Sequence, residues 1–350
     1  MKTVSVAASR PYDILIGSGL LAGIGQLVAS LGNASKITIV SDSNVFPIYG
    51  EVVTSRLSAS GFDCNFFVFP AGEERKNAGT YLSLLNHLAQ QKLSRSDLIL
   101  ALGGGVVGDL AGFAAGTYLR GIRYIQVPTT LLAAVDSSVG GKTAIDLPAG
   151  KNLAGCFWQP SLVVCDTDCL NTLPEDIFRD GCAEVIKYAV LFDPELFAHL
   201  QQHRLQFDRE WVIERCVQWK RDIVAQDEFD TGARMLLNFG HTLGHAVESL
   251  SNYQISHGKA VAIGMSLICR ACAKAYICDT EIRDRILALL ALFGLPCSAT
   301  YTPEKLFSAA CADKKRNGGV IHLIVPQSIG TCVIRPTPIC ELQSLIEAGF

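Results

Sequence analysis

A glycine-rich turn joins a continuous apolar run to a helix-compatible stretch. The run Asp97–Leu102 leads into Gly103-Gly104-Gly105-Val106-Val107-Gly108-Asp109, in which Gly103, Gly105 and Gly108 satisfy the pattern G-x-G-x-x-G. Glycine is needed at such a turn because the backbone bends tightly and lets a pyrophosphate approach the N–H groups at the start of the helix. The turn therefore predicts a parallel β-sheet that binds a dinucleotide.

The surroundings of this turn depart from the usual dinucleotide motif. An acidic residue for the ribose is expected about 20 positions later. The chain instead has Gln126-Val127-Pro128-Thr129-Thr130 there, and the motif lies deep in the chain rather than in its first strand–helix unit. We expect a dinucleotide site on a variant of the fold, and a purely structural glycine turn is the alternative.

Strand-like and helix-like segments alternate through the first half of the chain. Strand-like runs occupy residues 36–40, 66–69, 97–102 and 124–127. Apolar residues recur at helical spacing between residues 77 and 91, and this alternation predicts a parallel sheet covered by helices. From about residue 175 helical periodicity dominates, followed by one strand-like piece at 320–325. We expect an α/β Rossmann-like domain with a parallel sheet over residues 1–172, and a mainly α-helical domain over residues 173–350.

Charge and cysteine usage limit the class of protein. The formal net charge is −3 and no block of Lys and Arg stands out, so we expect no nucleic-acid partner and no membrane association. No stretch of about 20 residues stays apolar, and the first residues lack a secretory signal. The 13 cysteines are scattered along the chain rather than grouped as in a short disulfide-rich scaffold. They are read as reduced core residues, which indicates a cytoplasmic location.

A second constellation combines carboxylate and imidazole groups. Glu184 and Lys187 share one face of an apolar expected helix, His241 and His245 lie one helical turn apart, and His257 precedes the next helix. Glu184 with two of these histidines, leaving open positions for substrate oxygens, is typical of a catalytic zinc site. A cluster of surface histidines and a structural ion pair between Glu184 and Lys187 are the alternatives.

Positive side chains recur beside these motifs. They are Arg120, Lys142, Lys151, Lys187, Lys220, Arg234 and Lys314. Arg binds carboxylate or phosphate as a planar fork, and Lys acts as a mobile point charge. Their recurrence predicts a small, strongly anionic substrate, although each alone could be a solvated surface residue. Gly141-Lys142-Thr143 looks like the end of a P-loop, but Asp136 stands where the P-loop needs its first glycine, so an NTPase is disfavoured.

Together these motifs resemble the 3-dehydroquinate synthase family. The matching stretches are 103–109, 127–143, 150–155, 166–174, 184–188, 227–248, 257–265 and 313–315. In that family a Rossmann-like domain holds NAD, and a helical domain holds zinc, which Co²⁺ can replace, and most of the substrate. The enzymes are usually homodimers. There are two departures: Lys259 stands where the family commonly has glutamate after His-Gly, and Asp146 replaces a frequent histidine.

The resemblance implies roles for individual residues. Zinc would be bound by Glu184, His241 and His257, with His245 near the metal or the substrate. NAD would be surrounded by Asp42, Glu73, Lys76, Gly104, Gly105, Val106, Asp109, Thr129, Thr130, Lys142, Lys151 and Thr172. The substrate would meet Asp136, Lys142, Asn152, Lys187, Lys220, Arg234, Asn238 and Lys314, with Arg120 at its phosphate. Lys142, Lys187, Arg234, Asn238 and His245 would be catalytic, and the choice between Lys314 and Lys315 stays open.

The implied reaction converts 3-deoxy-D-arabino-heptulosonate 7-phosphate into 3-dehydroquinate and phosphate, a step of the shikimate pathway to the aromatic amino acids. NAD⁺ would oxidise the substrate in one step and would be regenerated from NADH in a later step. The nearest alternative is a related cyclase acting on a sugar phosphate without a carboxylate, which would leave Lys220, Arg234 and Lys314 unpaired. A metal-dependent polyol dehydrogenase would release NADH. A non-enzymatic nucleotide-binding module would not need Glu184, His241 and His257 together.

Overall fold

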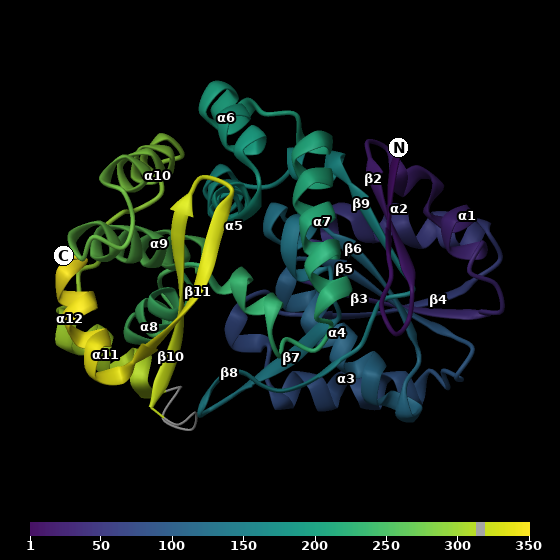
Figure 1. The fold of residues 1–350 in the computed structure, drawn as a ribbon. Coiled ribbons are helices and arrows are strands. Elements are labelled where there is room, and N and C mark those ends of the chain that lie inside the picture. The colour runs from purple at the N-terminus through teal and green to yellow at the C-terminus, as the bar shows by residue number, and fades with distance from the viewer. Residues whose placement is uncertain (313–318) are drawn as a thin grey trace. The chain divides into compact units, whose positions relative to one another are not determined.

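The computed structural model describes residues 1–312 and 319–350 (Figure 1). It divides into two compact units. The first comprises Met1–Leu173 with Arg209–Phe229, and the second comprises Pro174–Asp208 with Asp230–Phe350. Lys314 and Lys315, the two candidates for one substrate contact, lie outside the described residues.

A seven-stranded sheet forms the centre of the first unit. Its strands are β1 (Lys2–Val6), β2 (Tyr12–Gly17), β3 (Lys36–Asp42), β4 (Asp63–Phe69), β5 (Leu98–Gly103), β6 (Arg123–Pro128) and β9 (Leu162–Asp166). Their order is β1-β2-β9-β6-β5-β3-β4, with β1 antiparallel to β2 and the other neighbouring pairs parallel. The Rossmann-like parallel sheet expected from the glycine turn is therefore confirmed.

Helices cover both faces of this sheet. The unit contains η1 (Leu20–Gly23), α1 (Ile24–Ala29), α2 (Phe46–Ala59), η2 (Glu73–Arg75), α3 (Ala78–Gln90), α4 (Gly105–Thr117), η3 (Tyr118–Arg120), η4 (Ala133–Ser137) and η5 (Thr167–Asn171). Side chains alternate between the faces of a strand. Ile39 and Leu100 thus pack with residues of α1 and α2, and Val40 and Ala101 pack with residues of α3 and α4. Two separate apolar cores hold the sheet between its helices.

One helix from the later part of the chain returns to the first unit. Helix α7 (Arg209–Gln226) packs against β1, β2 and η4. Its Glu214 carboxylate lies 2.6 Å from the Lys2 ammonium on β1. The sequence-based division at residue 172 placed this helix in the second domain, and the contacts group it with the first. A hairpin of β7 (Lys142–Leu147) and β8 (Gly150–Phe157) completes the unit.

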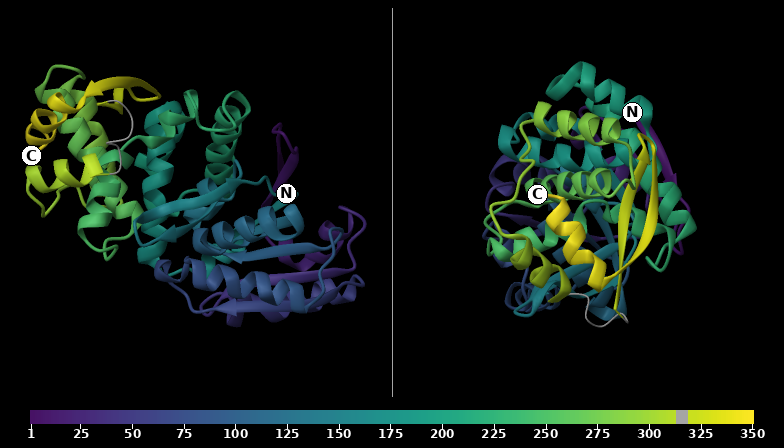
Figure 2. Two further views of the ribbon diagram at one scale, coloured as in Figure 1. Left: turned by 90° about the horizontal axis from the view of Figure 1, so that it is seen from below. Right: turned by 60° about the vertical axis from the view of Figure 1, so that its left-hand side comes forward.

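The second unit is mainly helical, as expected. It contains α5 (Glu175–Phe192), α6 (Pro194–His203), η6 (Arg204–Gln206), η7 (Ala233–Asn238), α8 (His241–Leu250), α9 (His257–Lys274), α10 (Thr280–Leu292), α11 (Pro303–Ala312) and α12 (Ile339–Ala348). Strands β10 (Val320–Ser328) and β11 (Thr331–Pro338) form an antiparallel hairpin, drawn in yellow beside the green helices in Figure 2. The sequence predicted β10 but not β11.

Helices α5 and α9 form the centre of this unit. Every residue from Gly181 to Leu191 is buried, and so is almost every residue of α9. A helix that is buried on all sides belongs to the interior of a domain. Even so, none of the helices in the described ranges has the length and apolar character that crossing a membrane requires.

The cysteines are thiols and not disulfides. None of the 13 is in a disulfide bond, and most of them are buried. Burial raises the pKa of the Cys182 thiol and of the Cys272 thiol, the latter to about 12. These side chains therefore behave as small apolar core residues, as the sequence predicted.

Candidate active site

The glycine turn lies at a topological switch point of the sheet. The chain runs from β3 to β4 on one side and then returns to β5 on the other side of β3. Ligands of open α/β sheets bind at the carboxyl ends of the strands at such a point. Asp42 ends β3 and Gly103 ends β5, and the two strands are in register through Ser41 and Leu102.

This placement puts an acidic side chain at the end of the strand next to the glycine turn. The glycine turn follows β5, which lies between β6 and β3 in the sheet. Strand β6, the next strand in the sequence, ends in Pro128, whereas β3 ends in Asp42. Asp42 precedes the turn in the sequence, so a search downstream of the glycines cannot find it. Its Oδ1 atom accepts the N–H groups of Asn44 at 2.8 Å and Val45 at 3.0 Å, which holds the carboxylate at the strand end.

The start of α4 offers donors to an anion. Gly104 is its N-cap residue and makes no side-chain capping bond. The Thr129 N–H donates to the Gly103 carbonyl at 3.0 Å, which places Thr129 beside the turn. The Thr129 hydroxyl is buried without a hydrogen-bond partner in the described part of the chain. Uncapped helical N–H groups and a buried hydroxyl fit a phosphate of a dinucleotide.

Lys76 is at the centre of a buried polar cluster in the same unit. Its ammonium lies 3.0 Å from Glu73 Oε1, 3.2 Å from Asp109 Oδ2 and 3.8 Å from Asp146 Oδ1. It also donates to Asn152 Oδ1 at 2.7 Å. Four residues predicted for NAD or substrate, Glu73, Lys76, Asp109 and Asn152, are therefore brought together.

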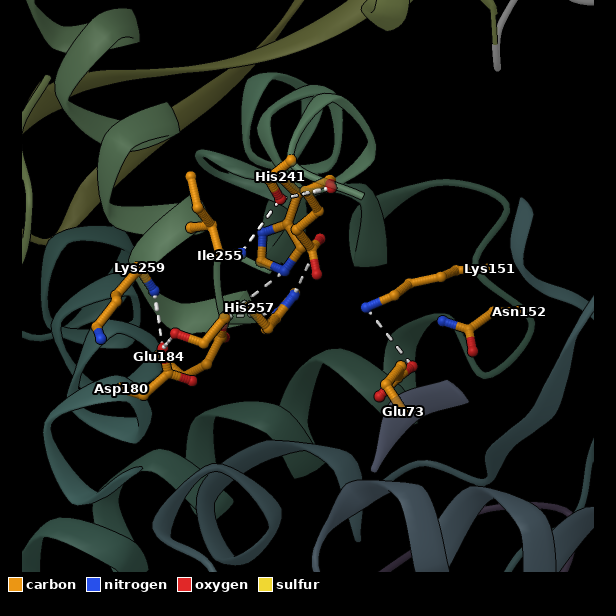
Figure 3. A network of polar contacts seen from close by, with 12 residues as sticks. Glu73, Lys151, Asn152, Asp180, Glu184, His241, Ile255, His257 and Lys259 are labelled. Carbon is orange, nitrogen blue, oxygen red and sulfur yellow. Dashed lines mark hydrogen bonds and ion pairs between the residues drawn. The ribbon is translucent and has the colours of Figure 1, made fainter. Parts of the chain in front are cut away.

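The charges of this cluster shift the pKa values of its members. Burial raises the pKa of Asp109 to about 6, although Lys76 acts in the opposite direction. Burial also tends to lower the pKa of Lys76, but the carboxylates of Asp109 and Glu73 outweigh it and raise that pKa. The Lys151 ammonium lies 3.5 Å from Glu73 Oε1 and extends the cluster, as Figure 3 shows.

The other predicted residues of the first unit lie at separate points. Thr130 accepts the Ala133 N–H at 3.2 Å, and the Thr172 hydroxyl lies 2.5 Å from the Tyr49 hydroxyl. Val106 is in the first turn of α4, and Lys142 is an exposed residue at the start of β7. Arg120 is an exposed residue at the end of η3, with φ of 65°.

Asp136 and Lys220 form a close ion pair. The Lys220 ammonium on α7 lies 2.6 Å from Asp136 Oδ1 and donates to the Asp136 carbonyl at 2.7 Å. Lys220 is nearly buried, with a side chain that is 7% exposed. This pair ties α7 to η4 and brings together two residues predicted for the substrate.

Three predicted metal ligands converge in the second unit. Glu184 on α5 is fully buried, and its Oε1 atom lies 3.5 Å from His241 Nε2 and 3.4 Å from His257 Nε2. The chosen ligand atoms of the three residues all lie within 4.8 Å of one another (Figure 3). The Lys187 ammonium contacts the other oxygen of Glu184. The structure therefore brings together the carboxylate and the two histidines that the resemblance selected.

The second ring nitrogen of each histidine is already engaged. His241 Nδ1 donates to the Phe239 carbonyl at 3.1 Å, and His257 Nδ1 lies 3.4 Å from Glu248 Oε2. With a hydrogen on Nδ1, Nε2 is the atom of each ring that a metal ion beside Glu184 would bind. Histidines that ligate metals characteristically donate their other N–H to a carbonyl or carboxylate in this way.

The spacing of the donor atoms fits a single small cation. Two atoms that are each about 2.1 Å from one tetrahedral ion lie about 3.4 Å apart. The observed separations from Glu184 Oε1 to the two Nε2 atoms are 3.4 and 3.5 Å. One carboxylate and two imidazoles are ligands that Zn²⁺ accepts, and they leave a coordination position open. The residues present therefore fit a catalytic zinc site.

The electrostatics of the two histidines differ. Burial lowers the pKa of His241 to about 3, although Glu184 acts in the opposite direction, so its ring is neutral and ready to ligate. Burial also tends to lower the pKa of His257, but Glu184 and Glu248 outweigh it and raise the pKa to about 10. The two carboxylates thus favour positive charge at this point, whether a proton or a metal ion.

Glycines allow the start of α8 to pack closely on the middle of α9. A Cβ atom on Gly264 of α9 would lie 2.0 Å from the Gly240 carbonyl, just before α8. No residue with a side chain allows this approach without moving the backbone. The contact packs α8 on α9 and so brings His241 near His257, whose ring centroids are 5.2 Å apart.

The remaining predicted residues of this unit lie in η7 and α8. Arg234 in η7 is buried, Asn238 ends η7, and His245 is exposed on α8. The centroid of the His245 ring lies 5.4 Å from that of His241 and 6.1 Å from that of His257. His245, Glu248 and His257 form a second group whose ligand atoms lie within 4.8 Å of one another.

Sequence reasoning missed Glu248 and the Phe239 carbonyl. Glu248 is 2% exposed on α8, where it follows the buried apolar residues Ala246 and Val247. A buried carboxylate needs a partner, so its position one turn after His245 was an available signal. The role of a backbone carbonyl depends on the fold and leaves no mark in the sequence.

Comparison with known proteins identifies the family. Residues 66–180 match the family model for the 3-dehydroquinate synthase N-terminal region, and residues 181–316 match that for its C-terminal region. A 3-dehydroquinate synthase of Pelobacter propionicus is 46% identical over 331 residues, covering 92% of each chain. One of Streptococcus thermophilus is 43% identical over 347 residues, covering 97% of each chain.

A solved structure shares the fold over the whole chain. It is 2-epi-5-epi-valiolone synthase from Streptomyces hygroscopicus subsp. jinggangensis with NAD⁺ and Zn²⁺ bound. It superimposes with a TM-score of 0.89 at 29% identity and covers 100% of this chain and 96% of its own. The sequence matches span both units and include the glycine turn and the three converging ligands. The chain belongs to the 3-dehydroquinate synthase family.

Proposed function

We propose that this chain converts 3-deoxy-D-arabino-heptulosonate 7-phosphate into 3-dehydroquinate and inorganic phosphate, and so acts as a carbon–oxygen lyase. The observation that carries the proposal is the convergence of Glu184, His241 and His257, with the Nδ1 atoms of both histidines turned to other partners. Such a donor set supports catalysis by a metal on a substrate rather than a structural ion pair.

Two cofactors are part of this proposal. NAD would bind at the carboxyl ends of β3 and β5, close to Asp42, the Gly104–Val106 turn and Thr129. Zn²⁺, replaceable by Co²⁺, would be held by Glu184, His241 and His257. The valiolone synthase with a similar fold carries NAD⁺ and Zn²⁺, which supports both assignments.

Each cofactor supplies one kind of chemistry. NAD, held by the residues named above, would supply a reversible hydride acceptor for a ring carbon of the substrate. The metal, when bound, acts as a Lewis acid on substrate oxygens. Temporary oxidation makes the neighbouring C–H acidic, so that phosphate can leave by elimination, and the phosphate itself can take the proton. Ring opening and an intramolecular aldol reaction then close the carbocycle.

The side chains of the chain bind and orient this substrate. In the second unit, buried Arg234 would hold the substrate carboxylate as a planar fork, with Asn238 and Lys187 close to the metal. His245, exposed on α8, would donate to or accept from the reacting oxygens. Lys187 touches Glu184, so its positive charge also limits the negative charge of the ligand set.

Residues of the first unit would complete substrate recognition. Arg120 would neutralise the phosphate, and Lys142 would place a mobile positive charge near the substrate. Asp136, Asn152 and Lys220 would hydrogen-bond substrate hydroxyls. The Asp136–Lys220 pair and the Asn152–Lys76 bond hold these three side chains in defined orientations before substrate binds. Such preorganisation lowers the entropic cost of reaching the reacting geometry.

The setting of the enzyme follows from the family. We infer that it works in the cytoplasm as a homodimer, in the shikimate pathway to the aromatic amino acids. The binding partners are small anionic sugar phosphates. The free thiols of the chain are consistent with a reducing compartment.

A metal-dependent polyol dehydrogenase is the alternative from another reaction class. The two functions differ in their products, because the dehydrogenase releases NADH and leaves the phosphate ester intact. The test is to incubate the purified protein with the heptulosonate phosphate, NAD and Zn²⁺ and to identify the products by NMR. Formation of a carbocyclic ketone and inorganic phosphate supports the proposal, and a product that keeps its phosphate ester contradicts it.

A further inference from the structure

Asp180 on α5 contacts the beginning of α9. It lies one helical turn before Glu184 on the same helix. Its Oδ1 atom accepts a hydrogen bond from the Ser256 hydroxyl at 2.5 Å and another from the Lys259 N–H at 2.9 Å. Figure 3 shows the bond from Lys259 to Asp180 beside Glu184 and His257. The two donors, Ser256 and Lys259, lie on either side of His257 in the sequence.

This carboxylate takes the place of a capping side chain. Ser256 is the N-cap residue of α9, but its hydroxyl makes no bond to its own helix. In most helices the N-cap side chain accepts the N–H of the second or third helical residue. Here Lys259, the third residue of α9, donates instead to Asp180 of another helix. A negative charge at a helix N-terminus also interacts favourably with the helix dipole.

Close backbone packing reinforces the contact. A Cβ atom on Gly258 would lie 1.9 Å from the Asp180 carbonyl oxygen and 2.8 Å from Asp180 Cγ. The first turn of α9 therefore rests directly on the Asp180 backbone. His257, between Ser256 and Gly258, has both of its neighbours held by one residue of α5. Its Nε2 atom then lies 3.4 Å from Glu184 Oε1 on that same helix.

From this arrangement we propose that Asp180 is a positioning residue that fixes the His257 ring at metal-ligating distance from Glu184. One turn of α5 thus determines the positions of two proposed metal ligands. It carries Glu184 itself, and it positions His257 through the first turn of α9. The inference rests on the proposed metal site and adds to it a residue that does not itself bind the ion. Without Asp180 the first turn of α9 would lose an acceptor for two donors, and His257 would sample other positions.

The test measures metal affinity of the full-length protein rather than turnover. Zn²⁺ is removed, and its binding is titrated in competition with a chromophoric chelator. The Asp180→Ala variant is expected to bind Zn²⁺ about 10–100-fold more weakly than the wild type. Asp180→Asn keeps an oxygen acceptor and is expected to stay within about threefold of the wild type, because the two hydrogen bonds rather than the charge hold the turn. Asp176→Ala, which removes an exposed carboxylate in the first turn of α5, is the matched control and should leave the affinity unchanged.

Two further measurements separate positioning from folding. Thermal unfolding of the metal-free variants shows whether they fold, and if Asp180→Ala does not, Asp180→Glu takes its place, since it keeps the charge but displaces the oxygens. The visible absorption of bound Co²⁺ reports the ligand geometry and should change in Asp180→Ala or Asp180→Glu but not in Asp180→Asn. A folded Asp180→Ala or Asp180→Glu variant with wild-type Zn²⁺ affinity and Co²⁺ spectrum would overturn the inference. If the wild type bound no metal, the metal site itself would be wrong.

Discussion

His257 Nδ1 lies 3.4 Å from Glu248 Oε2, a buried carboxylate on the neighbouring helix α8. Because this nitrogen is engaged with Glu248, the other nitrogen of the ring is the one that faces Glu184. Glu248 therefore determines which atom of His257 can act as a ligand. A residue without a role in the sequence analysis orients one of the three proposed metal ligands.

Replacing Glu248 should weaken metal binding without removing a ligand. In Glu248→Gln the negative charge beside His257 is lost, so the ring becomes a poorer donor and its orientation is less well held. We expect Zn²⁺ affinity to fall by about 10-fold or more. Competition with a chelator measures this, and Glu281→Gln, at an exposed acidic residue of α10, is the control. An unchanged affinity would show that Glu248 has no part in the site.

The histidines of the second unit should divide into ligands and non-ligands. His257→Ala removes a proposed ligand and should lose both bound zinc and turnover. His245→Ala should keep zinc with an affinity within about threefold of the wild type and lose turnover by about 100-fold, because this side chain is proposed to act on the substrate. Metal content after dialysis and steady-state rates give the two readouts. Retention of zinc by His257→Ala, with loss in His245→Ala, would reverse the assignment.

Arg234 should discriminate between substrates. It is buried, with 2% of its surface exposed, and is proposed to hold the substrate carboxylate. Arg234→Gln should reduce kcat/KM for the carboxylate-bearing heptulosonate phosphate by about 100-fold or more, since a bidentate charged contact contributes several kcal/mol. An analogue without the carboxylate should be turned over equally poorly by both proteins. Equal losses for the two compounds would remove the proposed role.

The sequence identified those parts of the fold that depend on local patterns. Strand β5 is buried along its whole length and leads into the glycine turn, so its apolar run and its glycines point to the same structure. Helix α7 shows what local patterns leave out. Its periodicity predicts a helix, but the partners that place it in the first unit, Lys2 and Asp136, are far away in the sequence.

Strand β11 was missed for a related reason. It contains Pro336 and Pro338, which lower the expectation of a strand, but its one partner within the described residues is β10, in a two-stranded sheet. Proline is tolerated at such an edge because the missing N–H is not needed for a second neighbour. The pairing, rather than the local sequence, decides that this segment is extended.

The candidate metal site also has parts that local sequence predicts and parts that depend on how the helices pack. The residues alone predicted that Glu184 and two of three histidines would form it, and only the family resemblance selected His241 and His257. The contacts of Asp180 and Glu248 connect residues of different helices, and the Phe239 carbonyl accepts from a ring only two residues later. Their donors and acceptors are ordinary helix or loop residues in the sequence. No periodicity or spacing distinguishes them before the helices are packed.

Asp97 should make folding stability depend on pH. This buried carboxylate accepts the N–H groups of Ser94, Lys36 and Ser35. Although burial tends to raise the pKa of Asp97, these hydrogen bonds lower it from 3.8 to about 2. Because the folded state then binds the proton less tightly than the unfolded state, the stabilisation is fully present above about pH 4 and is lost as the pH falls toward 2.

The pH dependence of stability can be tested by replacing the Asp97 carboxylate with an amide. Asp97→Asn should lower the free energy of unfolding by about 2–3 kcal/mol at pH 7, the amount that corresponds to the lowered pKa. The difference between the variant and the wild type should shrink when urea unfolding is repeated near pH 3. Asp63→Asn, at an exposed carboxylate on β4, is the control. A difference that stays constant between the two pH values would contradict the assigned pKa.

The central claim is that NAD and a metal held by Glu184, His241 and His257 act together in a cycle that eliminates phosphate and regenerates the cofactor. The most direct measurement follows inorganic phosphate and NADH at the same time, with the heptulosonate phosphate in large excess over NAD. We expect many phosphates released for each NAD present, no accumulation of NADH, and complete loss of the reaction after a chelator removes the metal. Accumulation of NADH without phosphate release, or an undiminished rate in the metal-free protein, would contradict the account.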